Sequence, residues 1–444
     1  MKFNQFKLAF SLLIISILSS CLGSNTVTTT SSDASFVSLT FAANDSIPYL
    51  NTAKFLLDGD GKTIVNIDSL PYKTRIDSVN PVFSFKSTAG TILYFNKSLY
   101  KYKKDSALIT GKDTIDFRNP VGVKNYASDA KTYLRYTVKV NVHTVDPELY
   151  IWTKVSDKLN SINATSQKTI LFNNTFFYFL NDGSNSYLYN STDGYNWNMS
   201  IVNGLPTNTP ITDMTLYNSK LYVTQDGFNI YSSSNGTTWV KKSTSDFTFK
   251  SLLFGLNGKL WAVVQAKSDL SYRFANSIDG DIWSMTSVIP TSFPLNDFAP
   301  ITFSTVTGKS KGLIVGGVST SGLALRTSWS TEDGNYWVNF STENNTLEAV
   351  QGASLIRYDN KLLLFGQIDA YVPIPVYQMS VDEGLSWQTP DTLRNVLPRN
   401  YQSRRYGSVV VNNNHIFIIG GKSGSTVYSD VWTGMLNRKK FIRQ

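Results

Sequence analysis

Polar side chains recur in this chain in a fixed local setting that could serve acid–base chemistry. Each follows a hydroxyl residue by two positions and precedes a tryptophan; the group comprises Asp193, Asn235, Asp279, Asp333 and Asp382. Paired carboxylates are the usual acid and base of glycoside-cleaving enzymes, so the pattern must be tested for catalysis. Asp and Asn beside Gly are also typical of tight turns, where the side-chain oxygen accepts backbone N–H groups. Turn chemistry accounts for every residue type here and predicts a structural role.

Arginine and tyrosine gather near the C-terminal end of the chain. This second group comprises Arg399, Tyr401, Arg404, Arg405 and Tyr406. Arginine binds anions through charged hydrogen bonds, and tyrosine rings pack on cations or ligand faces. The group is therefore our candidate binding site for an acidic or sugar ligand. The alternative is an ordinary surface loop in which one arginine covers the sheet beneath it.

No catalytic constellation emerges from the other residues. The two histidines, His143 and His415, are far apart in the sequence. There is no Gly-x-Ser-x-Gly elbow, P-loop or His-Glu-x-x-His helix. We predict no catalytic residue, metal or cofactor, although a paired-carboxylate hydrolase stays open because nothing selects the pair.

The first twenty residues have the pattern of a targeting segment. Lys2 and Lys7 precede an apolar run that is too short to span a bilayer, and Leu18-Ser-Ser-Cys21 follows. This resembles a bacterial lipoprotein signal, in which the thiol of the cysteine accepts a diacylglyceryl group. We expect a signal peptide over 1–20, lipidation and membrane anchoring at Cys21, and a flexible tether over 21–34. The predicted location is the cell envelope, on the outer membrane, with the membrane face left open.

Composition divides the remaining chain and narrows its partners. All nine tryptophans lie between Trp152 and Trp432, which places a domain boundary near residue 150. The formal charge of +9 is dispersed, and charged residues are only 16% of the chain. Together with the targeting segment, this argues against nucleic acid and leaves a glycan or an envelope protein as the expected ligand.

Residues 35–146 contain short strand-like runs separated by turn signals. The clearest run begins at Tyr136 and alternates apolar and polar residues to His143, as a half-buried strand requires. Several such strands predict a small β-sandwich. The segment around Ile115–Val121, with the strand after it, resembles Ig-like modules of Bacteroidota lipoproteins, which implies a spacer or scaffold.

Residues 149–444 are built from a repeat. The motif described above closes on tryptophan in each copy, and the tryptophans are Trp197, Trp239, Trp283, Trp337 and Trp387. They lie 42, 44, 54 and 50 residues apart, a period typical of four-stranded propeller blades. Hairpin turns such as Asn218-Ser219 and Asn413-Asn414 recur between the expected first and second strands. Six units result, and the last lacks its own tryptophan strand.

An unassigned strand around Trp152 stands before the first unit. As the outer strand of the last unit it would close a ring without an unpaired edge. The fold class predicted is therefore all-β, a small Ig-like β-sandwich followed by a six-bladed β-propeller closed by this N-terminal strand.

The repeat resembles the Asp-box, and Ser380–Trp387 matches its full length. Gly316-Gly317 and Gly420-Gly421 also resemble the kelch repeat. Sialidases carry Asp-boxes and use an arginine triad with tyrosine and glutamate, so a sialidase-like glycoside hydrolase is one alternative. No Arg-Ile-Pro sequence is present, and Arg273 is the sole arginine in units one to three.

The order of lipobox, sandwich and propeller resembles the uncharacterised Bacteroidota lipoprotein family built on domain of unknown function 6242. That resemblance implies no known activity. Our leading hypothesis is a lipid-anchored, non-enzymatic propeller that binds glycan or protein. A structural subunit of an outer-membrane uptake complex is the remaining alternative.

Overall fold

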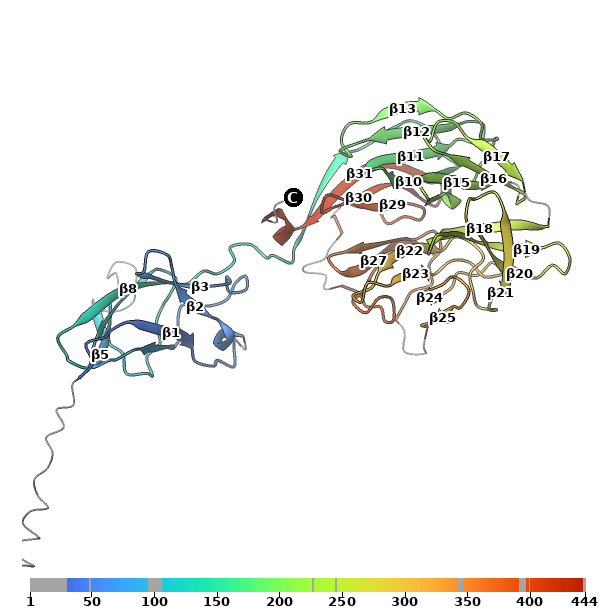
Figure 1. The fold of residues 1–444 in the computed structure, drawn as a ribbon. Coiled ribbons are helices and arrows are strands. Elements are labelled where there is room, and N and C mark those ends of the chain that lie inside the picture. Colours follow the sequence, from blue (N-terminus) through green and yellow to red (C-terminus); the bar gives the residue numbers. More distant parts are fainter. Residues whose placement is uncertain are drawn as a thin grey trace, which may run out of the picture. The chain divides into compact units, whose positions relative to one another are not determined.

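The computed structural model describes residues 30–441 apart from 48, 95–105, 226, 244–245, 342–345, 391–396 and 399. The expected signal peptide, Cys21 and Arg399 lie outside this part. The chain divides into two compact units, Met1–Asp146 and Pro147–Gln444, and each is described by itself. Strands form nearly all the regular structure (Figure 1). The described helices are short 3₁₀ turns: η2 (Leu50–Thr52), η3 (Ile211–Asp213) and η4 (Asn437–Phe441).

The first unit contains two sheets. In the smaller sheet β1 (Phe36–Phe41) pairs antiparallel with β4 (Pro81–Phe85). The larger sheet has the order β2-β3-β8-β7-β5-β6, with β3 and β8 parallel. Its strands are β2 (Phe55–Leu57), β3 (Thr63–Asn66), β8 (Tyr133–Lys139), β7 (Val121–Tyr126), β5 (Gly90–Tyr94) and β6 (Ser106–Leu108).

One apolar cluster lies between the two sheets of this unit. Leu39 and Phe41 of β1 pack with Ile64, Val123 and Val138 of the larger sheet. Apolar area removed from water by both sheets is the main force that holds them together. The unit is therefore a sandwich of two sheets around a common core.

The boundaries of one predicted strand need correction. Tyr136 and Val138 point into the core as expected, but β8 begins at Tyr133 and ends at Lys139. The sequence pattern also did not predict β7, because this strand buries the polar residue Asn125. The Asn125 amide donates to the carbonyls of Ala34 and Ser87, at 3.2 and 2.9 Å, which makes its burial tolerable.

Six antiparallel sheets follow one another in the second unit (Figure 1). The first three are β10 (Ser166–Phe172), β11 (Thr175–Asn181), β12 (Ser186–Ser191) and β13 (Asn198–Ile201); β14 (Thr215–Tyr217), β15 (Lys220–Gln225), β16 (Asn229–Ser233) and β17 (Val240–Ser243); and β18 (Phe247–Leu256), β19 (Lys259–Ala266), β20 (Tyr272–Ser277) and β21 (Trp283–Val288). The next two are β22 (Ala299–Ser304), β23 (Ser310–Val315), β24 (Ser328–Thr331) and β25 (Val338–Asn339); and β26 (Ser354–Tyr358), β27 (Lys361–Ile368) and β28 (Ile374–Ser380).

The last sheet joins the two ends of the second unit. It contains β29 (Ser408–Asn412), β30 (His415–Ser423), β31 (Thr426–Leu436) and β9 (Tyr150–Ser156), in that order. Trp152 of β9 lies opposite Gly434 of β31, where its ring covers the glycine. The strand that precedes the first propeller sheet, β9, thus forms the outer edge of the last sheet, which is the position expected for it.

The fifth sheet departs from the expected four strands. The segment that follows Trp387 forms only an isolated bridge between Met379 and Gln388. Pro390 comes two residues later, and proline has no N–H with which to continue a ladder. Among the described residues after Trp387, the fourth strand of this sheet is therefore represented by a single bridge.

Tight hairpins join the first and second strands of the sheets, as predicted. Both central residues have positive φ at Asn173-Asn174, Asn218-Ser219, Asn257-Gly258, Asp359-Asn360 and Asn413-Asn414. Two-residue turns of this kind match the right-handed twist of the flanking strands. The Asn and Gly at these positions accept the left-handed backbone at low cost.

The first strands contact one another in a closed cycle. Each of β10, β14, β18, β22, β26 and β29 contacts the next, and β29 contacts β10. Apolar clusters fill the space between neighbouring sheets: for example, Trp261 of the third sheet and Trp329 of the fourth share one cluster. The first strands therefore surround a common axis, and the site described below lies on it.

Candidate functional site

The repeated Asp and Asn side chains act as turn groups. In the motif at Asp279, the carboxylate Oδ1 accepts the N–H groups of Asp281 and Ile282 at 2.8 and 2.9 Å, and the hydroxyl of Ser277 at 3.0 Å. Asn235 accepts the equivalent pair of N–H groups at 3.0 and 2.9 Å with its amide oxygen. These backbone hydrogen bonds lower the pKa of Asp279 to about 2. A strongly ionised, fully engaged turn carboxylate is a poor candidate for an acid or base.

The other copies of the motif repeat this geometry. Backbone N–H groups donate to Asp193 and Asp333 at 2.8 to 2.9 Å. In the longer copy Asp382 accepts the Ser386 N–H at 2.9 Å. Turn hydrogen bonds thus engage the side chain at this position in every copy.

The motif tryptophans close the turns and pack between sheets. In the four shorter copies the indole N–H donates to the carbonyl of the motif glycine at 3.0 to 3.1 Å, from Trp197, Trp239, Trp283 and Trp337. The longer copy lacks this bond, and the indole N–H of Trp387 is buried without a partner. These side chains pack among apolar residues, and none of them lines the cavity on the axis of the first strands.

Two of the predicted binding residues point into the protein. Arg404 is buried and forms an ion pair with Asp430, and its Nη1 also donates to the Gly420 carbonyl at 3.1 Å. Its guanidinium lies 4.0 Å from the ring centroid of Tyr428 and 4.6 Å from that of Tyr401. Burial raises the pKa of Tyr401 to about 12. This geometry matches the structural alternative, in which an arginine covers the sheet beneath it.

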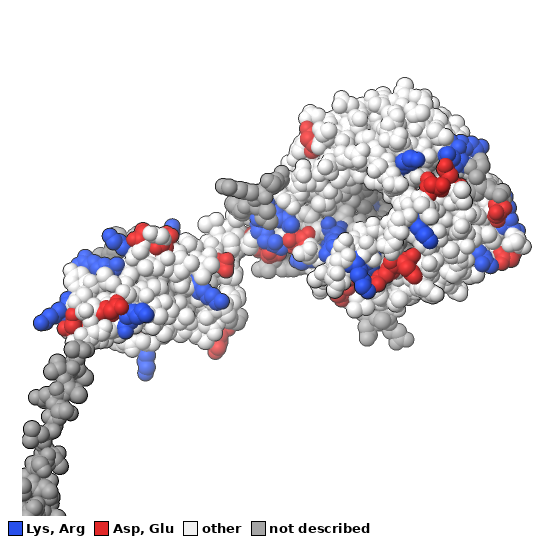
Figure 2. Space-filling view, viewed as in Figure 1, with Lys and Arg blue, Asp and Glu red and all other residues white. Residues whose placement is uncertain are grey.

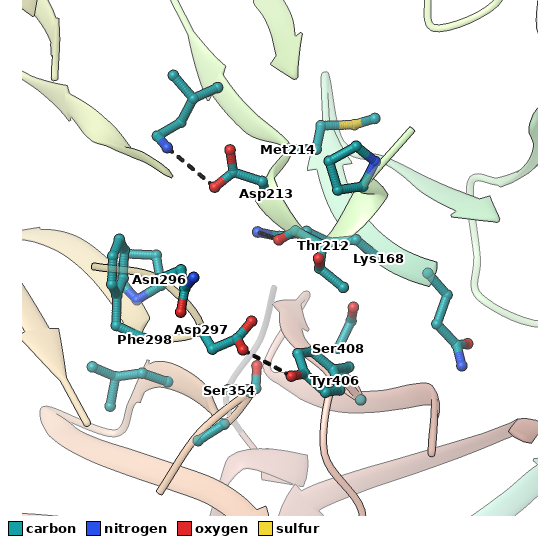
Figure 3. A pocket seen from close by; sticks show the side chains of 18 of the residues that line it. Lys168, Thr212, Asp213, Met214, Asn296, Asp297, Phe298, Ser354, Tyr406 and Ser408 are labelled. Atoms are coloured by element: carbon teal, nitrogen blue, oxygen red, sulfur yellow. Dashed lines mark hydrogen bonds between the residues drawn. The ribbon is translucent and has the colours of Figure 1, made fainter. Parts of the chain in front are cut away.

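Arg405 and Tyr406, the next two residues of this segment, have different partners. The guanidinium of Arg405 forms an ion pair with Asp369 at 2.7 Å. Tyr406 has positive φ, and its hydroxyl donates to Asp297 Oδ2 at 2.9 Å (Figure 3). Burial and the Asp297 carboxylate both raise the pKa of the Tyr406 hydroxyl. Among the described residues of the predicted binding group, Tyr406 is the one that lines a cavity on the axis of the first strands.

That cavity, which we call the axial cavity, has a volume of about 380 Å³. All six sheets of the second unit contribute to its wall, through the first strand or the segment just before it. Its polar lining includes Lys168, Thr169, Thr212, Asp213, Lys250, Asn296, Asp297, Ser354, Tyr406 and Ser408. Figure 2 shows a hollow in the second unit with basic side chains at its edge. Polar groups from every sheet thus converge on one cavity of ligand size.

Asp213 is the most perturbed acid of the axial cavity. Its Oδ2 accepts the Thr224 hydroxyl at 2.6 Å and its Oδ1 accepts the Leu252 N–H at 3.1 Å. Although the side chain keeps partial contact with the cavity, protein atoms surround the carboxylate closely. This desolvation raises its pKa to about 7, against the opposing effects of the two hydrogen bonds. Asp213 can therefore exchange a proton near neutral pH.

Lys168 stands beside Asp213 in the same cavity (Figure 3). Its Nζ donates to the carbonyl oxygen of Thr212 at 2.9 Å. Desolvation lowers the pKa of the Lys168 amine, and the charge of Asp213 opposes that shift. The two side chains interact electrostatically but form no ion pair within 4.0 Å in the described structure.

Asp297 is held by the loops of three sheets. It has positive φ, and its carbonyl accepts the Gly352 N–H at 2.7 Å. The Gly352 carbonyl in turn accepts the Tyr406 N–H at 2.6 Å, and the Tyr406 hydroxyl returns to the Asp297 carboxylate. This closed set of contacts orients Asp297 toward Tyr406 in the cavity (Figure 3).

An arginine triad is not found in the axial cavity, whose lining among described residues contains no arginine. Other arginines of the second unit have contacts elsewhere. Arg326 pairs with Glu348 at 3.9 Å, Arg357 donates to the Ser304 carbonyl, and Arg273 pairs with Asp269 at 3.1 Å. The described residues also contain no group of three His, Cys, Asp or Glu side chains that could hold a metal ion.

Sequence reasoning missed most of the cavity, because Lys168, Asp213, Lys250 and Asp297 belong to no motif. Their shared feature is position: each lies in a first strand or just before it. Since the hairpin turns locate five of the six first strands, ionisable residues at those strands point to Lys168, Asp213 and Lys250, and Asp297 precedes the sixth. The motif tryptophans drew attention to the outer strands instead.

The fold and cavity define a two-unit all-β protein whose second unit is a β-propeller. The chain belongs to the DUF6242 family: residues 146–444 match the DUF6242 beta propeller domain, and residues 22–140 match the N-terminal domain of the same family. The predictions of an all-β propeller and of this family are confirmed. No curated protein matches the chain. Among solved structures, that of YjhT is similar at 15% identity and a TM-score of 0.46, covering 62% of this chain and 96% of that one.

Proposed function

We propose that this protein is a non-enzymatic envelope lipoprotein that binds a glycan in its axial cavity. We take the six sheets as six blades around this cavity, closed by β9. The observation that carries the proposal is the convergence of polar first-strand residues from all six sheets on one cavity of about 380 Å³. Small-molecule sites typically occupy roughly 300–1,000 Å³, which suits one or two sugar rings here.

The chemistry of the lining favours a ligand rich in hydroxyl groups. Asp213 and Asp297 offer acceptors, Lys168 and Lys250 offer donors, and Ser354 can act as either. A sugar presents several hydroxyls that both donate and accept, so it can satisfy such a mixed set. An apolar ligand would leave these groups desolvated without partners, which is costly.

Calorimetric titration of the purified protein with a panel of monosaccharides and disaccharides tests the binding proposal. We expect at least one sugar to bind, and Asp297→Ala to weaken it about tenfold or more, because Asp297 accepts hydrogen bonds inside the cavity. Asp279→Asn is the matched control, since that carboxylate lies in an outer turn and should leave the affinity unchanged. Equal loss in both variants would contradict a cavity site.

The same proposal places the chain on the outer membrane through lipidated Cys21, with the sandwich as an Ig-like spacer. In the described part of the chain, no helix is long and apolar enough to cross a membrane. Cys21→Ser should move the protein from the membrane fraction to the soluble fraction. Metabolic labelling with a fatty acid should mark the wild type and not the variant. Membrane retention of an unlabelled variant would refute lipid anchoring.

A paired-carboxylate glycoside hydrolase is a second candidate function. It is favoured by one observation: Asp213, with a pKa raised to about 7, shares the cavity with Asp297. Glycoside cleavage requires two carboxyl groups, one of which donates a proton to the leaving group, and a raised pKa suits Asp213 to that role. Release of sugar from an aryl glycoside panel, abolished by Asp213→Asn, would support this function. Binding without turnover in both proteins would support the non-enzymatic reading.

A further inference from the structure

Lys250 reaches the axial cavity because the strand that carries it is irregular. In β18 the pairing with β19 passes from Phe249 opposite Val264 to Ser251 opposite Val263, which leaves Lys250 as an extra residue. Such a β-bulge re-aims the side chain of the inserted residue and is common beside functional sites. Phe249 and Leu252 remain in the same apolar cluster on either side of the bulge. The bulge therefore places a lysine at the cavity without disturbing the core.

The ammonium group of Lys250 has open donors. Within the described structure it forms no hydrogen bond and no ion pair, and it lies 5.9 Å from the ring centroid of Tyr272, a residue that does not line the cavity. The other charged groups of the cavity are engaged. Lys168 donates to Thr212, Asp213 accepts from Thr224 and Leu252, and Asp297 accepts from Tyr406.

We propose that the glycan bound in the axial cavity is acidic and that Lys250 binds its anionic group. This inference rests on the proposed function and narrows its ligand to sugars that carry a carboxylate or a phosphate. An ammonium with open donors in a partly desolvated cavity forms charge-assisted hydrogen bonds to either group. The hydroxyls of the same sugar then meet Asp297, Ser354 and Ser408 on the other walls.

The charge balance of the cavity supports an anionic ligand. Its lining holds Lys168 and Lys250 against Asp213 and Asp297. Burial lowers the pKa of the Lys168 amine and raises that of the Asp213 carboxyl, so these two groups favour their neutral forms together and the charge of Lys250 is left facing the cavity. An acidic sugar would complete the pairing of Lys250, whereas a basic ligand would face an uncompensated like charge.

Matched pairs of sugars provide the test. The purified protein is titrated with glucose and glucuronic acid, galactose and galacturonic acid, and glucose 6-phosphate, with acetate and inorganic phosphate as anions without a sugar. We expect an acidic sugar to bind about tenfold or more tightly than its neutral partner at low salt, with the preference decreasing at high salt. The phosphate and carboxylate arms show which anionic group is taken.

Variants assign any preference to Lys250. Lys250→Met should remove the preference for the acidic sugar and weaken the neutral sugar much less, because the neutral sugar loses one uncharged contact at most. Lys250→Arg should restore part of the preference. Lys259→Met is the control, because that lysine follows the Asn257-Gly258 hairpin, lies over the Trp261 ring at 6.0 Å and does not line the cavity. Unchanged thermal stability of Lys250→Met shows that the fold is intact.

The outcomes separate the two proposals. Equal binding of neutral and acidic sugars, or a preference that Lys250→Met retains, overturns the role of Lys250 but leaves sugar binding standing. Binding of acetate or phosphate as tightly as any acidic sugar also overturns it, since the sugar would then contribute nothing. If none of the sugars binds, both proposals fail.

Discussion

The outer turns and the axial cavity use the same side chain in opposite ways. At Asp279 the carboxylate stands in water and accepts two turn N–H groups, so its pKa decreases to about 2. At Asp213 the carboxylate also accepts two hydrogen bonds, yet desolvation outweighs them and raises its pKa to about 7. The two carboxylates accept a similar number of hydrogen bonds, so the degree of burial decides whether the pKa is raised or lowered.

That difference separates structural from functional polar groups in a repeat protein. The turn carboxylates recur because every sheet needs the same turn, and their surroundings hold them ionised. The cavity groups share no local motif, because the sheets contribute Lys, Asp and Ser side chains in different local sequences to one shared space. Repetition therefore marks the scaffold, and its absence marks the site.

The buried ion pair of Arg404 belongs to the scaffold, although Tyr406, two residues later in the sequence, lines the cavity. Arg404→Met would leave Asp430 buried with the Trp432 N–H at 2.8 Å and a longer ion pair with Lys154 at 4.0 Å. Loss of one partner of a buried pair costs about 3–5 kcal/mol of unfolding free energy. Urea unfolding measures this loss. Arg405→Met, which removes a pair with the half-exposed Asp369, should cost about 1 kcal/mol or less. If Arg404→Met lost sugar affinity without losing stability, Arg404 would belong to the binding site and not to the scaffold.

The glycines of the motif should be nearly as sensitive as the ion pair. Gly334 has a φ of 82°, and a Cβ there would lie 2.2 Å from Cε2 of Trp261 in the preceding sheet. Gly334→Ala should therefore cost about 3 kcal/mol, from a left-handed backbone together with overpacking. Gly308→Ala is the control: its φ is 81°, but nothing lies within 4 Å, so about 1 kcal/mol is expected. Equal losses in chemical denaturation would mean that packing between sheets contributes nothing at the motif.

Asp213 should make the protein less stable as the pH rises. Its folded pKa of about 7 exceeds the usual 3.8, so the folded state holds a proton that the unfolded chain releases, and stability falls between about pH 4 and 7. Asp213→Asn removes this dependence. Relative to the wild type, the variant should gain on the order of 2 kcal/mol between pH 4 and pH 8. Urea midpoints at these two pH values measure the gain, and parallel curves for both proteins would show that Asp213 is not desolvated.

The sequence predicted the scaffold much better than the cavity, for a physical reason. The motif tryptophans and the Asn and Gly hairpins repeat because local backbone geometry demands them, so their spacing reveals the sheets and the closing strand at Trp152. Single residues such as Lys250 carry no local signature. Their meaning depends on the ring of first strands and, for Lys250, on a bulge that no pattern of alternation predicts. β7 was missed for a related reason, since Asn125 is buried by partners distant in sequence.

Asp279→Asn should have the smallest effect and is the sharpest test of the turn side of the comparison. Asn235 already fills this position in another copy and accepts the same two N–H groups, so the variant should be only slightly less stable than the wild type near neutral pH. The wild-type carboxylate, with a lowered pKa, contributes stability above about pH 3.8 that is lost as the pH falls toward 2. The variant should lack that part of the acid dependence. Thermal unfolding between pH 2 and pH 7 measures both features. The stability of the wild type should rise with pH through Asp279, opposite to the effect of Asp213, because the pKa of Asp279 is lowered. The effect should be weaker than that of Asp213, because Asp279 is exposed. A loss of sugar affinity in Asp279→Asn would instead assign the turns a role in binding, which their hydrogen bonds do not suggest.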